Sequence, residues 1–125
     1  MIALDSSAVI AYLQGDESPT AAAAGVVLAE GHACLPPVVL TEVLSDPKLP
    51  RRVADLIGAL PVLEVSEGYW RRAGELRSHV LAAGHRAPLA DTLIAQSCLD
   101  HDVSLVSSDR DFRHFAKAGG LRVLP

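Results

Sequence analysis

Short apolar runs that alternate with helical segments constrain the fold of this chain more than any other feature. The runs cover residues 1–4, 33–35, 61–65, 103–107 and 121–124. The segments between them carry helix signals, such as Ser18 and Pro19 before an alanine-rich stretch and Gly31 after it. Strands that alternate with helices of about ten residues are typical of a parallel sheet covered on both faces. The sequence therefore predicts a single α/β domain over residues 1–125, with a mainly parallel sheet of about five strands.

The composition is that of a compact intracellular protein. The chain has 125 residues, of which 50% are hydrophobic, enough for one core without disulfides or structural metal. Cys34 and Cys98 both lie in apolar segments, which favours buried thiols in a reducing compartment over a disulfide framework or a zinc site. No apolar run approaches the ~20 residues of a membrane span, and no signal-peptide pattern precedes the first strand. We therefore expect a cytoplasmic protein without membrane contact.

Acidic residues interrupt or directly follow the apolar segments. They are Asp5, Glu42, Asp91, Asp109 and Asp111. A carboxylate rarely enters an apolar environment unless something pairs with it. No Lys or Arg lies at helical spacing from Glu42 or Asp91 on the same apolar segments. A divalent cation with oxygen ligands is the most economical partner, and Mg²⁺ or Mn²⁺ suits that ligand set.

The predicted topology brings these acids together. Asp5 and Asp109 both follow the C-terminal ends of strands, where ligands bind in open parallel sheets. If those strands are neighbours, the two ends lie ~5 Å apart. Converging carboxylates repel one another, whereas a bound cation requires their negative charge. Two such ions ~4 Å apart can hold a phosphodiester and activate a water for its hydrolysis.

Each acid also has a simpler interpretation. Asp5 and Asp109 could be helix N-caps, and Asp91 could serve the dipole of its helix. Glu42 could face solvent. The metal site remains the better hypothesis because the simpler one requires all of these positions to be incidental. Loops of the P-loop and dinucleotide-binding kinds are absent from the sequence, so those nucleotide-binding folds are not expected.

Four segments of the chain resemble the motifs of PIN domains. They are residues 2–10 (IALDSSAVI), 40–44 (LTEVL), 89–95 (LADTLIA) and 106–112 (VSSDRDF). Their order and spacing resemble the VapC toxins of bacterial and archaeal toxin–antitoxin pairs. The resemblance implies a three-layer α/β/α fold and a Mg²⁺- or Mn²⁺-dependent endoribonuclease. It also implies a homodimer and a small VapB-like antitoxin that covers the site.

The resemblance also assigns roles to single residues. Asp5, Glu42, Asp91 and Asp109 match the acidic quartet of the family, which is catalytic and metal-binding. Three further positions match as metal-binding or supporting residues: Asp111 as a second acid of the last motif, Ser7 as the hydroxyl after the first Asp, and Ser107 as a hydroxyl able to hold Asp109. The expected reaction is hydrolysis of RNA phosphodiester bonds, in transfer RNA or another structured RNA, by metal-activated water.

Two other functions stay open at this point. One is a PIN-like binding module without activity, and the other is a phosphatase that uses Asp5 as its nucleophile. Net charge neither supports nor excludes a polyanionic substrate: it is −4, but setting aside the five placed acids leaves ten acids against eleven Lys and Arg. Arg86, Arg110 and Arg113 lie near the motifs and are candidates for contact with a nucleic-acid backbone.

Overall fold

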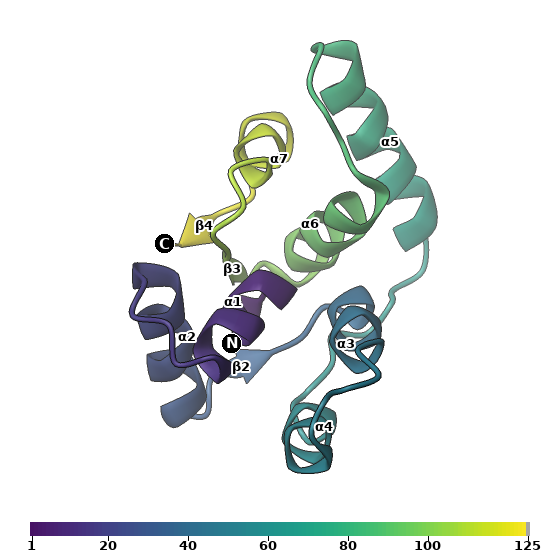
Figure 1. Cartoon of the computed structure of the whole chain (residues 1–125). Coiled ribbons are helices and arrows are strands. Elements are labelled where there is room, and N and C mark those ends of the chain that lie inside the picture. The colour runs from purple at the N-terminus through teal and green to yellow at the C-terminus, as the bar shows by residue number, and fades with distance from the viewer. Residues whose placement is uncertain (125) are drawn as a thin grey trace.

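The computed structural model describes residues 1–124 as a parallel sheet surrounded by helices (Figure 1). The strands are β1 (Ile2–Leu4), β2 (Ala33–Cys34), β3 (Ser104–Val106) and β4 (Val123–Leu124). The helices are α1 (Ser6–Leu13), α2 (Pro19–Ala29), α3 (Pro37–Leu44), α4 (Arg51–Gly58), α5 (Tyr69–Ala82), α6 (Leu89–His101) and α7 (Phe112–Gly119). The strand order is β2-β1-β3-β4, and every pair is parallel.

Helices cover the sheet in the predicted three-layer α/β/α arrangement. Helix α2 contacts β2 and β3, and it lies on the opposite side of the molecule from α5 in Figure 1. Helix α6 contacts β3 and packs against α5 and α7, while α7 also contacts β4. The predicted fold class is therefore confirmed. Among the described residues no helix is both long enough and apolar enough to cross a membrane.

The predicted number of strands is wrong by one. Residues 61–65 do not form a strand, and only an isolated parallel bridge joins Leu35 to Val62. Two backbone hydrogen bonds of 2.9 Å flank this bridge, from the Leu35 amide to the Pro61 carbonyl and from the Leu63 amide to the Leu35 carbonyl. The ladder cannot extend because Pro36 and the residue after it have no N–H to donate. The sheet described by residues 1–124 therefore has four strands.

Fully buried apolar side chains anchor the backbone next to two of the acidic positions. Leu4 and Phe112 have no exposed surface, and they lie directly beside Asp5 and Asp111. Burial of a side chain of this size stabilises the fold by about 1.5–3 kcal/mol. The core thus holds the end of β1 and the start of α7 in place. With them it holds Asp5, which follows β1, and Asp111, which precedes α7.

Candidate metal centre

The ends of two neighbouring strands bring Asp5 and Asp109 to one edge of the sheet. Strands β1 and β3 pair with Ile2 opposite Ser104 and with Leu4 opposite Val106. The Asp5 amide then donates a 3.0 Å hydrogen bond to the Val106 carbonyl. The condition under which the sequence places Asp5 and Asp109 close together, that these two strands are neighbours, is therefore met.

The Asp5 carboxylate is buried and held by several donors. Its exposed fraction is 4%. Oδ1 accepts a 2.8 Å bond from the Ser6 amide, which is the N-cap contact of α1. Oδ2 accepts bonds from the hydroxyls of Ser7, at 2.8 Å, and Ser107, at 2.7 Å. Asp5 thus caps the helix and also belongs to a hydroxyl network, so the two interpretations of this residue are compatible.

Ser107 joins two of the acidic positions. Its hydroxyl donates to Asp5 and accepts a 3.0 Å bond from the Asp109 amide. The sequence predicted that this hydroxyl would hold Asp109, and in the structure it holds the Asp109 backbone and the Asp5 side chain together. One buried serine therefore links the ends of β1 and β3.

Glu42 approaches the same group from α3. Its Oε1 accepts a 3.3 Å hydrogen bond from the Ser6 hydroxyl, which also lies 3.4 Å from Asp5 Oδ1. Nothing in the sequence points to this contact between Ser6 and Glu42, because it depends on the packing of α3 against α1.

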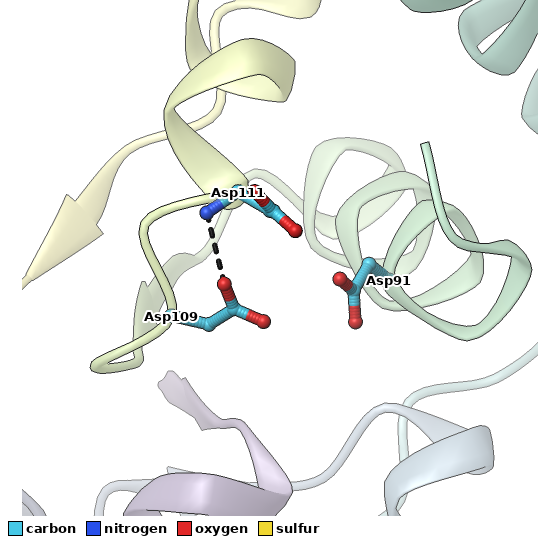
Figure 2. A group of neighbouring side chains, drawn as sticks. All are labelled: Asp91, Asp109 and Asp111. Carbon is cyan, nitrogen blue, oxygen red and sulfur yellow. Dashed lines mark hydrogen bonds between the residues drawn. The ribbon is translucent and has the colours of Figure 1, made fainter. Parts of the chain in front are cut away.

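Asp91, Asp109 and Asp111 form a group of three carboxylates. Each offers one oxygen such that these atoms all lie within 4.8 Å of one another. Figure 2 shows Asp91 on α6 facing Asp109 and Asp111, which come from the segment before α7. The Asp111 amide donates a 2.9 Å bond to Asp109 Oδ1, so this turn orients the Asp109 side chain.

Burial, and after it repulsion between the acids, raises the pKa of two of them. Burial is the largest cause that raises the pKa of Asp91 from 3.8 to about 7, and the charges of Asp109, Asp5, Asp111 and Glu42 add to it in that order. A helix dipole alone would instead lower the pKa of a first-turn acid. The pKa of Glu42 is also raised, first by burial and further by the charge of Asp5, against the bond from Ser6.

No cationic side chain neutralises these five acids within residues 1–124. The ion pairs of the described chain join His32 to Glu30, Arg72 to Asp100 and Arg122 to Asp102. A cluster made only of carboxylate oxygens, with hydroxyls that fix one member, suits a hard divalent cation such as Mg²⁺ or Mn²⁺. Asp91, Asp109 and Asp111 have the spacing to share one ion, and Asp5 and Glu42 lie close enough to act on Asp91 electrostatically.

Known proteins resemble this chain in family and in fold. A family model described as PIN domain matches residues 2–118. No curated protein sequence matches significantly. A chain in the crystal structure of VapBC2 from Rickettsia felis, bound to a DNA fragment from their promoter, is similar over 99% of this chain and 98% of that chain. The two superpose with a TM-score of 0.75 at 18% identity, a likeness of fold.

Proposed function

Since this chain belongs to the PIN domain family, we propose that it is a single-domain, metal-dependent endoribonuclease. The family membership confirms the resemblance suggested by the four sequence motifs. In this proposal residues 1–125 form one domain with one activity, the hydrolysis of phosphodiester bonds in transfer RNA or another structured RNA.

The observation that carries the proposal is the group of three carboxylates Asp91, Asp109 and Asp111, each with an oxygen within 4.8 Å of the others. No ion pair of the described chain compensates the group, and burial together with the neighbouring charges raises the pKa of Asp91 to about 7. Such repulsion lowers the stability of the folded protein unless a cation is bound. A group of neighbouring carboxylates that lowers the stability of the metal-free fold and offers several oxygen ligands is typical of a catalytic site.

The residues of the site have distinct roles in this proposal. Asp5, Glu42, Asp91 and Asp109 are the catalytic acids, and with Asp111 they would hold Mg²⁺ or Mn²⁺. A divalent cation supplies polarisation of a phosphodiester oxygen and a lowered pKa for the attacking water. Ser7 and Ser107 keep both Asp5 and the Asp109 backbone in a fixed geometry through their hydroxyls.

The protonation of Asp91 ties occupancy of the site to pH. With a pKa of about 7, this carboxyl holds its proton about half of the time at neutral pH when no cation is present. Binding of a cation requires the charged form, so Asp91 would release that proton. Nearby Glu42, whose pKa is raised as well, adds to the same effect.

We further propose that the protein is the toxin of a type II toxin–antitoxin system. The likeness to a chain of the VapBC2 complex supports this proposal, together with the family membership. The partners would be a VapB-like antitoxin that covers the acidic site and a second copy of this chain in a homodimer. The buried free thiols of Cys34 and Cys98 are compatible with a reducing cytoplasm.

An Asp-nucleophile phosphatase is disfavoured by the residues around Asp5. That chemistry usually wants a second acid two residues after the nucleophile, and position 7 here is Ser7, whose hydroxyl donates to Asp5 Oδ2. An inactive PIN-like module would keep the fold without binding metal, and the same experiment separates it from the nuclease.

The test is cleavage of total cellular RNA by the purified, partner-free protein with Mg²⁺ or Mn²⁺. We expect discrete fragments from the parent, their loss in EDTA, and none from Asp5→Asn. Asp55→Asn is the matched control because Asp55 is exposed on α4. Cleavage by Asp5→Asn at the parental rate would contradict the proposal. A folded parent that neither cuts RNA nor binds Mn²⁺ would favour the inactive module.

A further inference from the structure

A cavity opens beside the acidic site on the side of β4 and α7. Its volume is about 480 Å³. Asp109 and the hydroxyl residues Ser107 and Ser108 belong to its wall, together with Arg110 and Arg113. Ala116, Val123 and Leu124 complete the lining. The cavity therefore combines one acid of the site, two guanidinium groups and an apolar wall.

The two arginines of this cavity have no partner within the described chain. Arg110 and Arg113 are exposed, and neither forms an ion pair or a side-chain hydrogen bond among residues 1–124. Some of the other arginines are committed: Arg72 binds Asp100 and Arg122 binds Asp102. Arg77 donates to the Ala87 carbonyl. Arg86, the third candidate from the sequence, is not among the residues that line the cavity.

The local charge differs in sign from that of the whole chain. The net charge of the protein is −4, yet residues 112–124 contain no Asp or Glu. They contain Arg113 and Lys117 one turn apart on α7, and Arg110 precedes them at helical spacing. The basic side of the cavity is therefore directly adjacent to a strongly acidic cluster.

We propose that Arg110 and Arg113 form a phosphate-binding subsite for the RNA strand next to the bond that is cut. This inference rests on the proposed nuclease function and names the part of the site that binds substrate. Arg binds phosphate oxygens through parallel N–H donors, so it suits a backbone contact. The apolar wall at Ala116, Val123 and Leu124 offers a surface for a ribose or base of the same nucleotide.

Electrostatics explains why such a subsite is needed at this position. Five carboxylates repel an approaching polyanion, and bound cations offset that repulsion only at the scissile phosphate. Phosphates on either side of it remain close to the acids. Two uncompensated guanidinium groups beside Asp109 provide attraction where the next phosphate of the strand would lie.

The test compares RNA binding by an Arg110→Gln/Arg113→Gln double variant with that of the parent, both in an Asp5→Asn background that does not cut. The probe is a fluorescein-labelled oligouridylate, and its affinity is measured at several salt concentrations with Mg²⁺. We expect affinity about tenfold weaker at low salt and a slope of log K against log salt that is shallower by about 1.4, since each single-strand phosphate contact contributes about 0.7. Arg113→Lys, with Arg110 unchanged, should keep most of the parental slope of log K against log salt, because lysine keeps the positive charge.

Arg51→Gln is the matched control. Arg51 begins α4, which lies at the bottom of Figure 1, whereas α7 lies in its upper half. This variant should leave both affinity and slope unchanged. Mn²⁺ affinity, measured by calorimetry without RNA in the otherwise parental protein, should also be unchanged in the double variant. A parallel loss of Mn²⁺ binding would overturn the proposal, because Arg110 would then act through the acids that flank it.

The outcomes separate the subsite from the nuclease. If the parent cuts RNA but the double variant matches Arg51→Gln in affinity and slope, the subsite is refuted and the nuclease stands. If RNA binding depends on the two arginines but no RNA is cut with either metal, the arginines bind phosphate, but the nuclease fails and with it the placement of the subsite next to a bond that is cut. If the substitutions weaken binding of an acidic peptide but not of the RNA probe, the arginines serve a protein partner and the proposal is overturned.

Discussion

The Ser107 hydroxyl donates a 2.7 Å hydrogen bond to Oδ2 of Asp5, a residue 102 positions away in the chain. The bond is buried, and the same hydroxyl accepts from the Asp109 amide. It fixes the carboxylate after β1 relative to the loop after β3, so the geometry of the acids does not depend on the backbone ladder alone.

Ser107→Ala should weaken both the fold and the metal site. The change leaves Asp5 Oδ2 with only the Ser7 bond and removes the acceptor of the Asp109 amide. We expect a loss of about 1–2 kcal/mol in the free energy of unfolding, measured by urea denaturation. Mn²⁺ affinity should fall by about tenfold or more, as is usual when a group that orients a ligand is removed.

Ser108→Ala is the control for that change. Ser108 is exposed and makes no side-chain hydrogen bond to the acids in the described chain. Its substitution should leave stability and Mn²⁺ affinity as they are in the parent. Equal effects of the two alanine variants would show that the network around Asp5 has no special role.

Asp91→Asn should make the metal-free protein more stable at alkaline pH. The folded pKa of Asp91 is about 7, above its ordinary value of 3.8. The folded state therefore holds a proton that the unfolded state has released, and stability falls as the pH rises from about 4 to about 7. In EDTA at pH 8, we expect the free energy of unfolding of the variant to exceed that of the parent by on the order of 1–2 kcal/mol. This is less than the whole pKa shift would give as free energy, because solvent screens the partly exposed carboxylate.

The pH dependence itself checks the cause of that gain. Between pH 5 and pH 8 the metal-free parent should lose stability relative to Asp91→Asn, as followed by denaturation curves in EDTA. Asp55→Asn, on an exposed part of α4, should follow the parent. If the parent gained stability over this pH range relative to Asp91→Asn, the charged form of Asp91 would not be destabilised in the folded protein, and the explanation would be wrong.

Asp100→Asn should destabilise the junction of α5 and α6. Arg72 donates to both Asp100 oxygens, at 2.9 and 2.7 Å, and Gln96 donates to one of them at 2.8 Å. The bond from Arg72 is the main reason that the pKa of Asp100 lies below its ordinary value. The stability that it contributes is present above the unfolded pKa of about 3.9 and is lost as the pH falls through the lower folded pKa.

We expect Asp100→Asn to lower the free energy of unfolding by about 2 kcal/mol at pH 7. The difference in this free energy between the variant and the parent should shrink below pH 4. Asp102→Asn provides the comparison. Its ion pair with Arg122 is solvent-exposed, with 88% of the Asp102 side-chain surface accessible. Exposed pairs contribute little, so this variant should lie within about 0.5 kcal/mol of the parent. Similar losses of unfolding free energy in both variants would contradict the claim that the Arg72–Asp100 pair stabilises the fold more than the exposed Arg122–Asp102 pair.

The sequence predicted the edge of the sheet at which Asp5 and Asp109 lie, but not the number of strands. Alternating apolar runs and helices place Asp5 and Asp109 at adjacent strand ends, because parallel strands share one carboxyl edge. The strand expected at residues 61–65 is wrong because the prolines after Leu35 limit the pairing there to a single bridge between Leu35 and Val62. Local apolar pattern does not report such missing donors on the partner strand.

Contacts between distant segments were the other limit. The Ser6 hydroxyl reaches Glu42 across 36 positions, and this contact follows from how α3 packs on α1. The dual partners of Ser107 likewise depend on the strand register. Residue types and spacing can nominate a carboxylate, but only the folded geometry shows which hydroxyl holds it.

Calorimetric titration of the partner-free protein with Mn²⁺ at pH 7, in two buffers of different ionisation enthalpy, tests the central claim most directly. Because the Asp91 pKa is about 7, we expect saturable binding with release of about half a proton or more per site. Asp91→Asn should bind Mn²⁺ much more weakly and without that release. Absence of saturable Mn²⁺ binding by the folded parent, or equal binding by Asp91→Asn, would contradict the assignment of these carboxylates as a metal centre.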